Sequence, residues 1–205
     1  MTSFSDAERE RIRKAIIEAE SATSGEIVAV ITARSDDYFF IPFLWAALAA
    51  LFVPLPLYFF STVPPQQIYL LQLLVFLAAG LLVLWPPLRI ALVPGAVKRA
   101  RAHRHAVEQF LAQNLHTTNG RTGVLIFVSM AEQFVEVIAD QGIYEKVVPK
   151  TWEDIVDSMT GDIARGNIVD GFVQVIGACG AVLAEHFPPG TADENELPNH
   201  LIILD

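Results

Sequence analysis

The chain has 205 residues, of which 53% are hydrophobic and only 18% are charged, a composition too apolar for an ordinary soluble domain and typical of a membrane protein. Its formal net charge of −9 argues against a nucleic-acid-binding protein, because such proteins carry a basic surface. The only cysteine, Cys179, excludes an intramolecular disulfide and an all-cysteine metal site.

The stretch before the apolar region predicts a helix followed by a strand. Ser5 and Glu8 form the capping-box pattern in front of a helix whose Ile12 and Ile16 lie on one face. The sequence GEIVAVITA at 25–33 then predicts a β-strand, because it is rich in β-branched residues. One helix and one strand cannot form a core alone. Residues 1–37 are therefore predicted to be the first part of a split α/β domain.

No charged residue occurs between Asp37 and Arg89. Residues 38–88 are predicted to form a transmembrane helical hairpin, because they hold two apolar stretches of about 18 to 20 residues, the length that a helix needs to cross hydrocarbon. The predicted spans are 41–60 and 68–85.

Pro54 and Pro56 lie inside the first span and predict a kink there, which membrane helices tolerate when neighbouring groups satisfy the backbone. A re-entrant or wholly buried helical pair is the alternative to a hairpin that crosses twice. A channel or transporter is disfavoured, because the spans contain no charged residue.

Positive charges beside the spans predict the orientation of the hairpin. The connecting loop has no Lys or Arg, whereas Arg34 precedes the first span and a basic cluster follows the second. Both flanks and both termini are therefore predicted to face the cytoplasm. The cluster either binds anionic lipid headgroups or serves only to determine topology. It consists of Arg89, Lys98, Arg99, Arg101 and Arg104.

Residues 89–187 are predicted to complete the α/β domain, beginning with a helix at 96–116 and two strands. The strand TGVLIFVSM at 122–130 is apolar on both faces, as in a central strand covered by helices, and QFVEVIAD at 133–140 alternates less strictly. The helix is predicted to bury one apolar stripe, formed by Val107, Phe110, Leu111 and Leu115.

Two further helices are predicted at 151–165 and 167–187. Thr151 and Asn167 are the expected N-caps, and Gly166 is expected to end the first helix. Three glycines are expected to let another element approach closely: Gly171, Gly177 and Gly180. Residues 188–205 are predicted to be an acidic linker and a tail, HLIILD, that either pairs as an edge strand or docks on the domain.

The sequences TSGEIVAVI, RTGVLIFVSMAEQFVEVIADQGI and ACGAVLAEHFP together resemble the TPM domain family of thylakoid-lumen phosphatase-like and photosystem II repair-like proteins. More specifically, they resemble its bacterial membrane-protein branch with an inserted hairpin. The resemblance implies an α/β fold, with a small mixed β-sheet flanked by helices in an α/β/α sandwich and an inserted two-helix transmembrane hairpin. It also implies a multi-pass protein of the bacterial inner membrane.

Members of this family have been associated with acid phosphatase activity, with divalent cation binding near strand ends, and with assembly or repair of membrane complexes. This chain departs from the family where a glycine-rich turn usually follows the second hairpin strand. It has ADQGIYEK there instead, so the acidic turn residues of the family do not carry over directly.

Asp140, Glu145 and Glu26 are the candidate metal ligands, and calcium or magnesium would be the cation, because hard cations take oxygen ligands. Asp140 ends the second hairpin strand, Glu145 follows it, and Glu26 would join them if its strand were adjacent and oppositely directed. The alternatives for Asp140 are a solvated strand end or a cap on the following helix. Glu136 shares its face but lies about 13 Å away along the strand, too far for a catalytic pair.

Two functions follow from these patterns. The first is a non-enzymatic interaction, assembly or regulatory module for a membrane complex, whose partners are the lipid bilayer and another membrane protein. Its acidic C-terminal half would be the partner face, because residues 130–205 carry three Lys or Arg against fourteen Asp or Glu. The alternative is a divalent-cation-dependent, acid-phosphatase-like hydrolase in which the metal polarises a phosphate oxygen.

Overall fold

A computed structural model of the chain describes residues 4–190 and 195–204, apart from the side chains of residues 162 and 164. The chain divides into two compact units: an α/β unit, Met1–Ser35 with Arg99–Asp205, and a hairpin unit, Asp36–Lys98. Residues 191–194 in the predicted acidic linker, and the terminal residue 205, lie outside the described residues.

The α/β unit is built on a four-stranded mixed sheet with the order β3-β2-β1-β4. Strand β1 pairs in parallel with both β2 and β4, while β2 pairs with β3 in an antiparallel hairpin. The C-terminal tail therefore forms an edge strand, one of its two predicted placements. The strands are β1 (Glu26–Thr32), β2 (Gly123–Ser129), β3 (Phe134–Ala139) and β4 (Leu201–Leu204).

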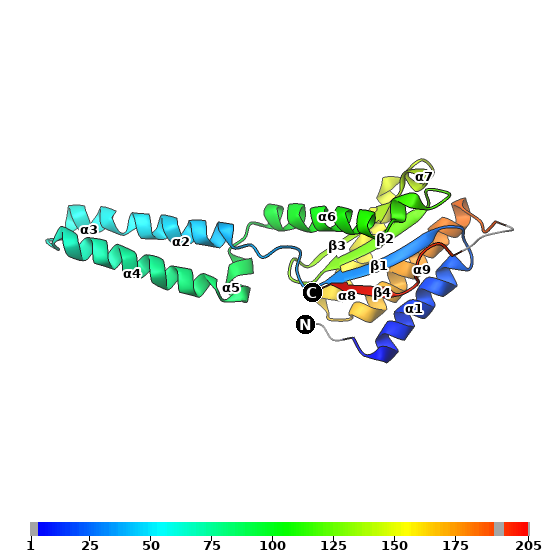
Figure 1. Cartoon of the computed structure of the whole chain (residues 1–205), viewed down its shortest axis with the longest axis horizontal. Helices are drawn as coiled ribbons and strands as arrows, with labels where there is room; N and C mark the ends of the chain where they lie inside the picture. Colours follow the sequence, from blue (N-terminus) through cyan, green and yellow to red (C-terminus); the bar gives the residue numbers. More distant parts are fainter. Residues whose placement is uncertain (1–3, 191–194, 205) are drawn as a thin grey trace. The chain divides into compact units, whose positions relative to one another are not determined.

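Helices cover both faces of this sheet, as Figure 1 shows. One face packs against α6 (Gly95–Ala112), and the other packs against α1 (Asp6–Glu20), α8 (Pro149–Ala164) and α9 (Ile168–His186). Strands β1 and β2 are buried along their whole length, because they lie between the two helical layers. The predicted small mixed sheet flanked by helices is thus confirmed.

The predicted helix at 96–116 is too long. Helix α6 ends at Ala112, because Asn114 adopts a left-handed conformation (φ 59°), and a separate 3-10 turn, η1 (Leu115–Thr117), follows. The predicted stripe is accordingly wrong in part: Val107 is 37% and Leu111 53% exposed. The helix buries Ala102, Ala106 and Phe110, of which Ala106 and Phe110 pack against the sheet.

Helix α8 begins at Pro149, two residues before the predicted cap, so Thr151 lies in its first turn. A proline fits this first helical position, because its missing N–H would have no partner there. Gly166, with φ 82°, follows the end of α8 as predicted. Asn167 is the N-cap residue of α9, although its side chain makes no capping hydrogen bond.

Two of the predicted close-approach glycines on α9 behave differently. At Gly180 a Cβ atom would lie 2.6 Å from the Cβ of Ala19, so the absence of a side chain lets α1 and α9 pack closely. At Gly177 a Cβ would meet nothing within 4 Å, so the prediction is wrong there. Gly177 lies on the exposed side of the helix, which periodicity did not distinguish.

Three helical stretches among the described residues are long and apolar enough to cross a membrane: Phe40–Phe60, Pro65–Val83 and Ile168–His186. The third is α9, whose buried residues, including Phe172, Ile176 and Leu183, belong to the main core of the α/β unit. Composition alone therefore does not distinguish this core helix from the two helices of the hairpin unit.

The hairpin unit contains α2 (Phe40–Phe52), α3 (Pro54–Phe60), α4 (Pro65–Val83) and α5 (Pro86–Ala91). The first arm is interrupted at Val53, just before Pro54, which is where the prolines predicted a kink. Large apolar side chains cover its surface, with exposed fractions that reach 78% at Phe40 and 89% at Phe60.

Candidate functional site

The predicted metal ligands lie at one edge of the sheet, where β1 and β2 begin and β3 ends. We call this the amino edge, defined by Glu26, Gly123 and Asp140. Glu26 is paired with Gly123 on β2, and the backbone N–H of Asp140 donates to the carbonyl of Gly123 (2.9 Å). Strand β2 therefore separates β1 from β3. Glu26 would lie beside Asp140 only if their strands were adjacent, and they are not.

Gly123 lets the η1 turn lie against this edge. A Cβ atom on Gly123 would lie 2.5 Å from the carbonyl oxygen of Leu115, and one on Gly142 would lie 2.7 Å from the carbonyl oxygen of Gly120. The backbone of 115–121 thus occupies the place of the missing side chains. With neighbouring strands about 4.8 Å apart, the backbones of Glu26 and Asp140 are roughly 10 Å from each other.

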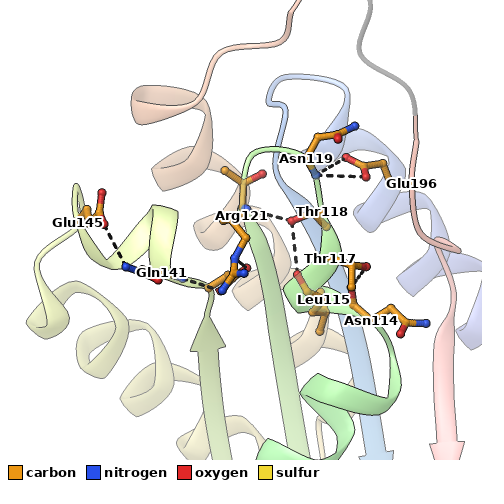
Figure 2. A network of polar contacts seen from close by, with 11 residues as sticks. Asn114, Leu115, Thr117, Thr118, Asn119, Arg121, Gln141, Glu145 and Glu196 are labelled. Atoms are coloured by element: carbon orange, nitrogen blue, oxygen red, sulfur yellow. Dashed lines mark hydrogen bonds and ion pairs between the residues drawn. The ribbon is translucent and has the colours of Figure 1, made fainter.

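Asp140 is 5% exposed, and its side chain has two partners, Gln141 and Arg121, both labelled in Figure 2. It is the N-cap of the short helix α7 (Gln141–Tyr144), accepting from the backbone N–H of Gln141 at 2.7 Å. Its Oδ1 also accepts from Nη2 of Arg121 at 3.1 Å, and its Oδ2 lies 2.8 Å from Nε of Arg121 in an ion pair without a hydrogen bond. Of the predicted alternatives, the cap on the following helix is the one that the structure shows.

Glu145 follows α7 and is exposed, with Oε1 accepting from the side chain of Gln141 at 3.4 Å. In Figure 2 its marked contact is with Gln141. Within residues 4–190 and 195–204 the structure contains no group of three or more His, Cys, Asp or Glu placed to hold a metal ion. The three carboxylates predicted from the sequence are therefore not brought together.

Glu136, on the same face as Asp140, instead contacts α6. Glu136 lies on the edge strand β3, and its Oε1 is 2.8 Å from Nδ1 of His103 on α6. Burial raises the pKa of Glu136, and the hydrogen bond from His103 partly offsets that increase. His105, two residues further on, stacks edge-on against Phe127.

An open cavity of about 620 Å³, which the sequence analysis did not predict, lies beside Glu26. Most of the residues that line it are polar, and they come from the end of α1, the start of β1 and the segment before β4. Glu20 from α1 is a second acidic side chain beside Glu26. Its Oε1 accepts a hydrogen bond from the backbone N–H of Ile27 on β1 (2.8 Å). The lining includes Arg13, Glu20, Thr23, Glu26, Asn195 and Asn199.

Carboxylates of this edge hold the segment that leads into β4. Glu20 Oε2 accepts from the side-chain amide of Asn199, and Glu26 Oε1 accepts from the backbone N–H of Glu196 at 3.1 Å. Glu196 in turn accepts from the backbone N–H of Asn119 at 3.1 Å (Figure 2). The arrangement can position the C-terminal strand against β1.

Burial raises the pKa of Glu20 from 4.5 to about 8, and the neighbouring charge of Glu26 acts in the same direction. The folded state therefore binds a proton more tightly than the unfolded chain. Stability falls as the pH rises from about 4.5 to about 8, because ionising this carboxyl is harder in the folded state. The loss is absent below this range and complete above it.

We expect Glu20→Gln to stabilise the protein at pH 9 by about 1–2 kcal/mol, a figure reduced because the cavity is open to water. The side-chain oxygen of a glutamine still accepts from the backbone N–H of Ile27. Its NH₂ group can donate to Oδ1 of Asn199, which is buried without a hydrogen bond, if the side-chain amide of Asn199 rotates by half a turn. Thermal unfolding of wild type and variant at pH 4 to 9 measures the difference.

Glu18→Gln on the exposed side of α1 is the matched control and should leave the pH profile unchanged. A wild-type stability that does not fall relative to the Glu20→Gln protein between pH 5 and pH 8 would contradict the assignment.

The residues of the basic cluster do not share one environment. Arg89 lies in α5 and is 4% exposed, whereas Arg99, Arg101 and Arg104 lie on exposed positions of α6. Lys98, also in α6, is half-buried. The cluster is therefore composed of one enclosed guanidinium and a set of surface cations.

The fold and this edge define a mixed α/β protein with helices on both faces of a four-stranded sheet. The NMR structure of the BA42 protein from the psychrophilic bacterium Bizionia argentinensis is similar, with a TM-score of 0.62 and 20% sequence identity. The match covers 99% of this chain and 97% of that chain, and at this identity it shows the fold alone. No family model and no curated protein matches the sequence.

Proposed function

We propose that this protein is a membrane-anchored, TPM-like α/β module that acts in the assembly or regulation of a membrane complex. The observation that carries the proposal is the surface of the hairpin unit. Phe59, Phe60 and Leu81 are 72%, 89% and 69% exposed, on a segment without a single charge between Asp37 and Arg89. A lipid bilayer is the environment that would cover so large an apolar surface.

The lengths of the two arms support this placement. Helix α4 has 19 residues, which at a rise of about 1.5 Å per residue spans roughly 28 Å, close to the thickness of the hydrocarbon core. The first arm, Phe40–Phe60, has 21 residues. Each arm is long enough for one crossing.

The sheet supports a common side for both ends of the hairpin. Strand β1 precedes the hairpin in the sequence and β2 follows it, yet the two pair in parallel from Glu26↔Gly123 to Thr32↔Ser129. The chain must therefore return to the side from which it left. The basic cluster favours the cytoplasmic side, and we place the protein in the bacterial inner membrane with both termini in the cytoplasm.

The partner would be another membrane protein with a basic cytoplasmic segment. Helix α8 exposes Glu153, Asp154 and Asp157, of which Asp154 pairs with Lys150 at 3.1 Å. An exposed pair of this kind contributes little to stability, so this acidic face remains available to steer a cationic partner.

Cysteine labelling tests the topology, because the native cysteine should react poorly. Cys179 is fully buried, and burial raises the pKa of its thiol to about 12. We expect Thr62→Cys, in the exposed turn between α3 and α4, to react with a membrane-impermeant maleimide added to intact spheroplasts. Lys14→Cys, on the exposed face of α1, should react only after permeabilisation.

Labelling of Lys14→Cys in sealed spheroplasts would overturn the orientation, and release of the protein by an alkaline carbonate wash would overturn the membrane anchor. Crosslinking in native membranes tests the assembly role. A stoichiometric membrane partner supports it, whereas turnover of a phosphate ester by the pure protein, without such a partner, would favour the hydrolase instead.

A further inference from the structure

The side chain of Arg89 is buried and lies against an aromatic ring of the same unit. It is 4% exposed, its Nε has no hydrogen-bond partner, and its guanidinium carbon lies 4.2 Å from the centroid of the Phe39 ring. This contact joins the residue before α2 to α5. The ring fixes the plane of the guanidinium and supplies part of the stabilisation that water would otherwise give.

In the part of the chain that the structure describes, no carboxylate is paired with this charge. Residues 38–107 contain neither Asp nor Glu, and among the described residues Arg89 forms no ion pair. Enclosing a cation without a counter-charge is costly, so a partner anion from outside the chain would stabilise the site. A guanidinium, with its fork of N–H donors, matches a phosphate group in bidentate geometry.

The position of Arg89 in the chain indicates which phosphate that is. Helix α4 ends at Val83, the largely exposed Trp85 follows, and Pro86 starts α5, which Figure 1 shows at a steep angle to α4. Tryptophan is typical of the membrane interface, and the residues just beyond it lie at the level of the headgroups.

We infer that Arg89, oriented by Phe39, is a binding site for the phosphate of an anionic phospholipid on the cytoplasmic side of the membrane. The inference rests on the proposed membrane anchor. The inference gives Arg89 a different role from Arg99 and Arg104. Those two residues are exposed on α6 and would attract the same lipids only through their charge. Bound lipid would close the base of the hairpin by holding α5 against the start of α2.

The test measures lipid retention by the purified full-length chain. Wild type, Arg89→Gln and Arg104→Gln are exchanged into micelles with added phosphatidylglycerol or phosphatidylcholine, and bound lipid is counted by native mass spectrometry. We expect Arg89→Gln to lower phosphatidylglycerol affinity about tenfold, while Arg104→Gln, with the same change in charge, lowers it about twofold or less. Arg89→Lys should fall between wild type and Arg89→Gln, because it keeps the charge and loses the fork.

Equal losses for Arg89→Gln and Arg104→Gln would overturn the site and leave only a diffuse charge effect. If inorganic phosphate, at the same concentration as the lipid, displaced the bound phosphatidylglycerol, the site would bind free phosphate rather than a lipid headgroup. Phe39→Leu provides a second variant with the arginine intact and should also weaken retention. A carbonate wash of each variant distinguishes the two proposals. If only the lipid site is wrong, the protein stays in the membrane, whereas if the membrane anchor is wrong, the wash releases it.

Discussion

Gly123→Ala is expected to destabilise the α/β unit by about 3 kcal/mol, one of the two largest effects we expect from a single substitution. The new Cβ would lie 2.5 Å from the carbonyl oxygen of Leu115, and a backbone atom cannot move aside as a side chain can. The η1 turn would have to shift, and with it the Arg121 that pairs with Asp140. Thermal unfolding of the detergent-purified chain measures the loss.

Gly177→Ala is the matched control. A Cβ there meets nothing within 4 Å, and alanine is the better helix former, so stability should rise by up to about 1 kcal/mol. Adding Leu115→Ala to Gly123→Ala should not restore stability, because the closest contact is with the carbonyl rather than with the side chain. Recovery in that double variant would show that the turn is not held by its backbone.

Asp140→Ala is expected to cost about 2 kcal/mol, the second large effect. The substitution removes the cap on α7 and both contacts with Arg121, whose side chain is 52% exposed and can turn to water. Asp140→Asn should cost about half as much, because asparagine is also a good N-cap residue. Arg121→Gln should cost more than Asp140→Asn, since it leaves a buried carboxylate without its cation.

The same variants decide whether Asp140 is a metal ligand. Calcium or magnesium would have to displace Arg121 from both carboxylate oxygens. We expect calorimetric titration with either cation to give the same weak response for wild type and Asp140→Asn. Saturable binding that is lost in Asp140→Asn would establish the metal site, and with it the case for the hydrolase.

Periodic apolar patterns predicted most of the sheet and its helices. The capping box at Ser5 and Glu8 is formed as expected, with both of its reciprocal hydrogen bonds, and β2 is buried on both faces. These features depend on neighbours within a few positions, so the local sequence contains what is needed to predict them. The end of α6 was missed because the left-handed residue that ends it is an asparagine, which also occurs inside helices.

The candidate site could be predicted only in part. Asp140 and Glu26 were correctly expected at strand ends, but the pairing of Asp140 with Arg121 was not predicted. Glu20 was missed altogether, because nothing around position 20 distinguishes it from the exposed Glu18. Its pKa of about 8 comes from burial beside β1 and from Glu26, which a sequence does not place next to it.

The sequence by itself determined the chemical character of each segment: an uncharged apolar stretch between Asp37 and Arg89, strands that require cover on both faces, and an acidic C-terminal half. Only the tertiary structure decided which groups meet. The order β3-β2-β1-β4 places Gly123 between Glu26 and Asp140, and at the same edge Asp140 pairs with Arg121. Within the hairpin unit, packing sets Arg89 against Phe39. The reason is physical: local patterns fix which face of an element is buried, whereas pairing between distant strands fixes which polar ends become neighbours.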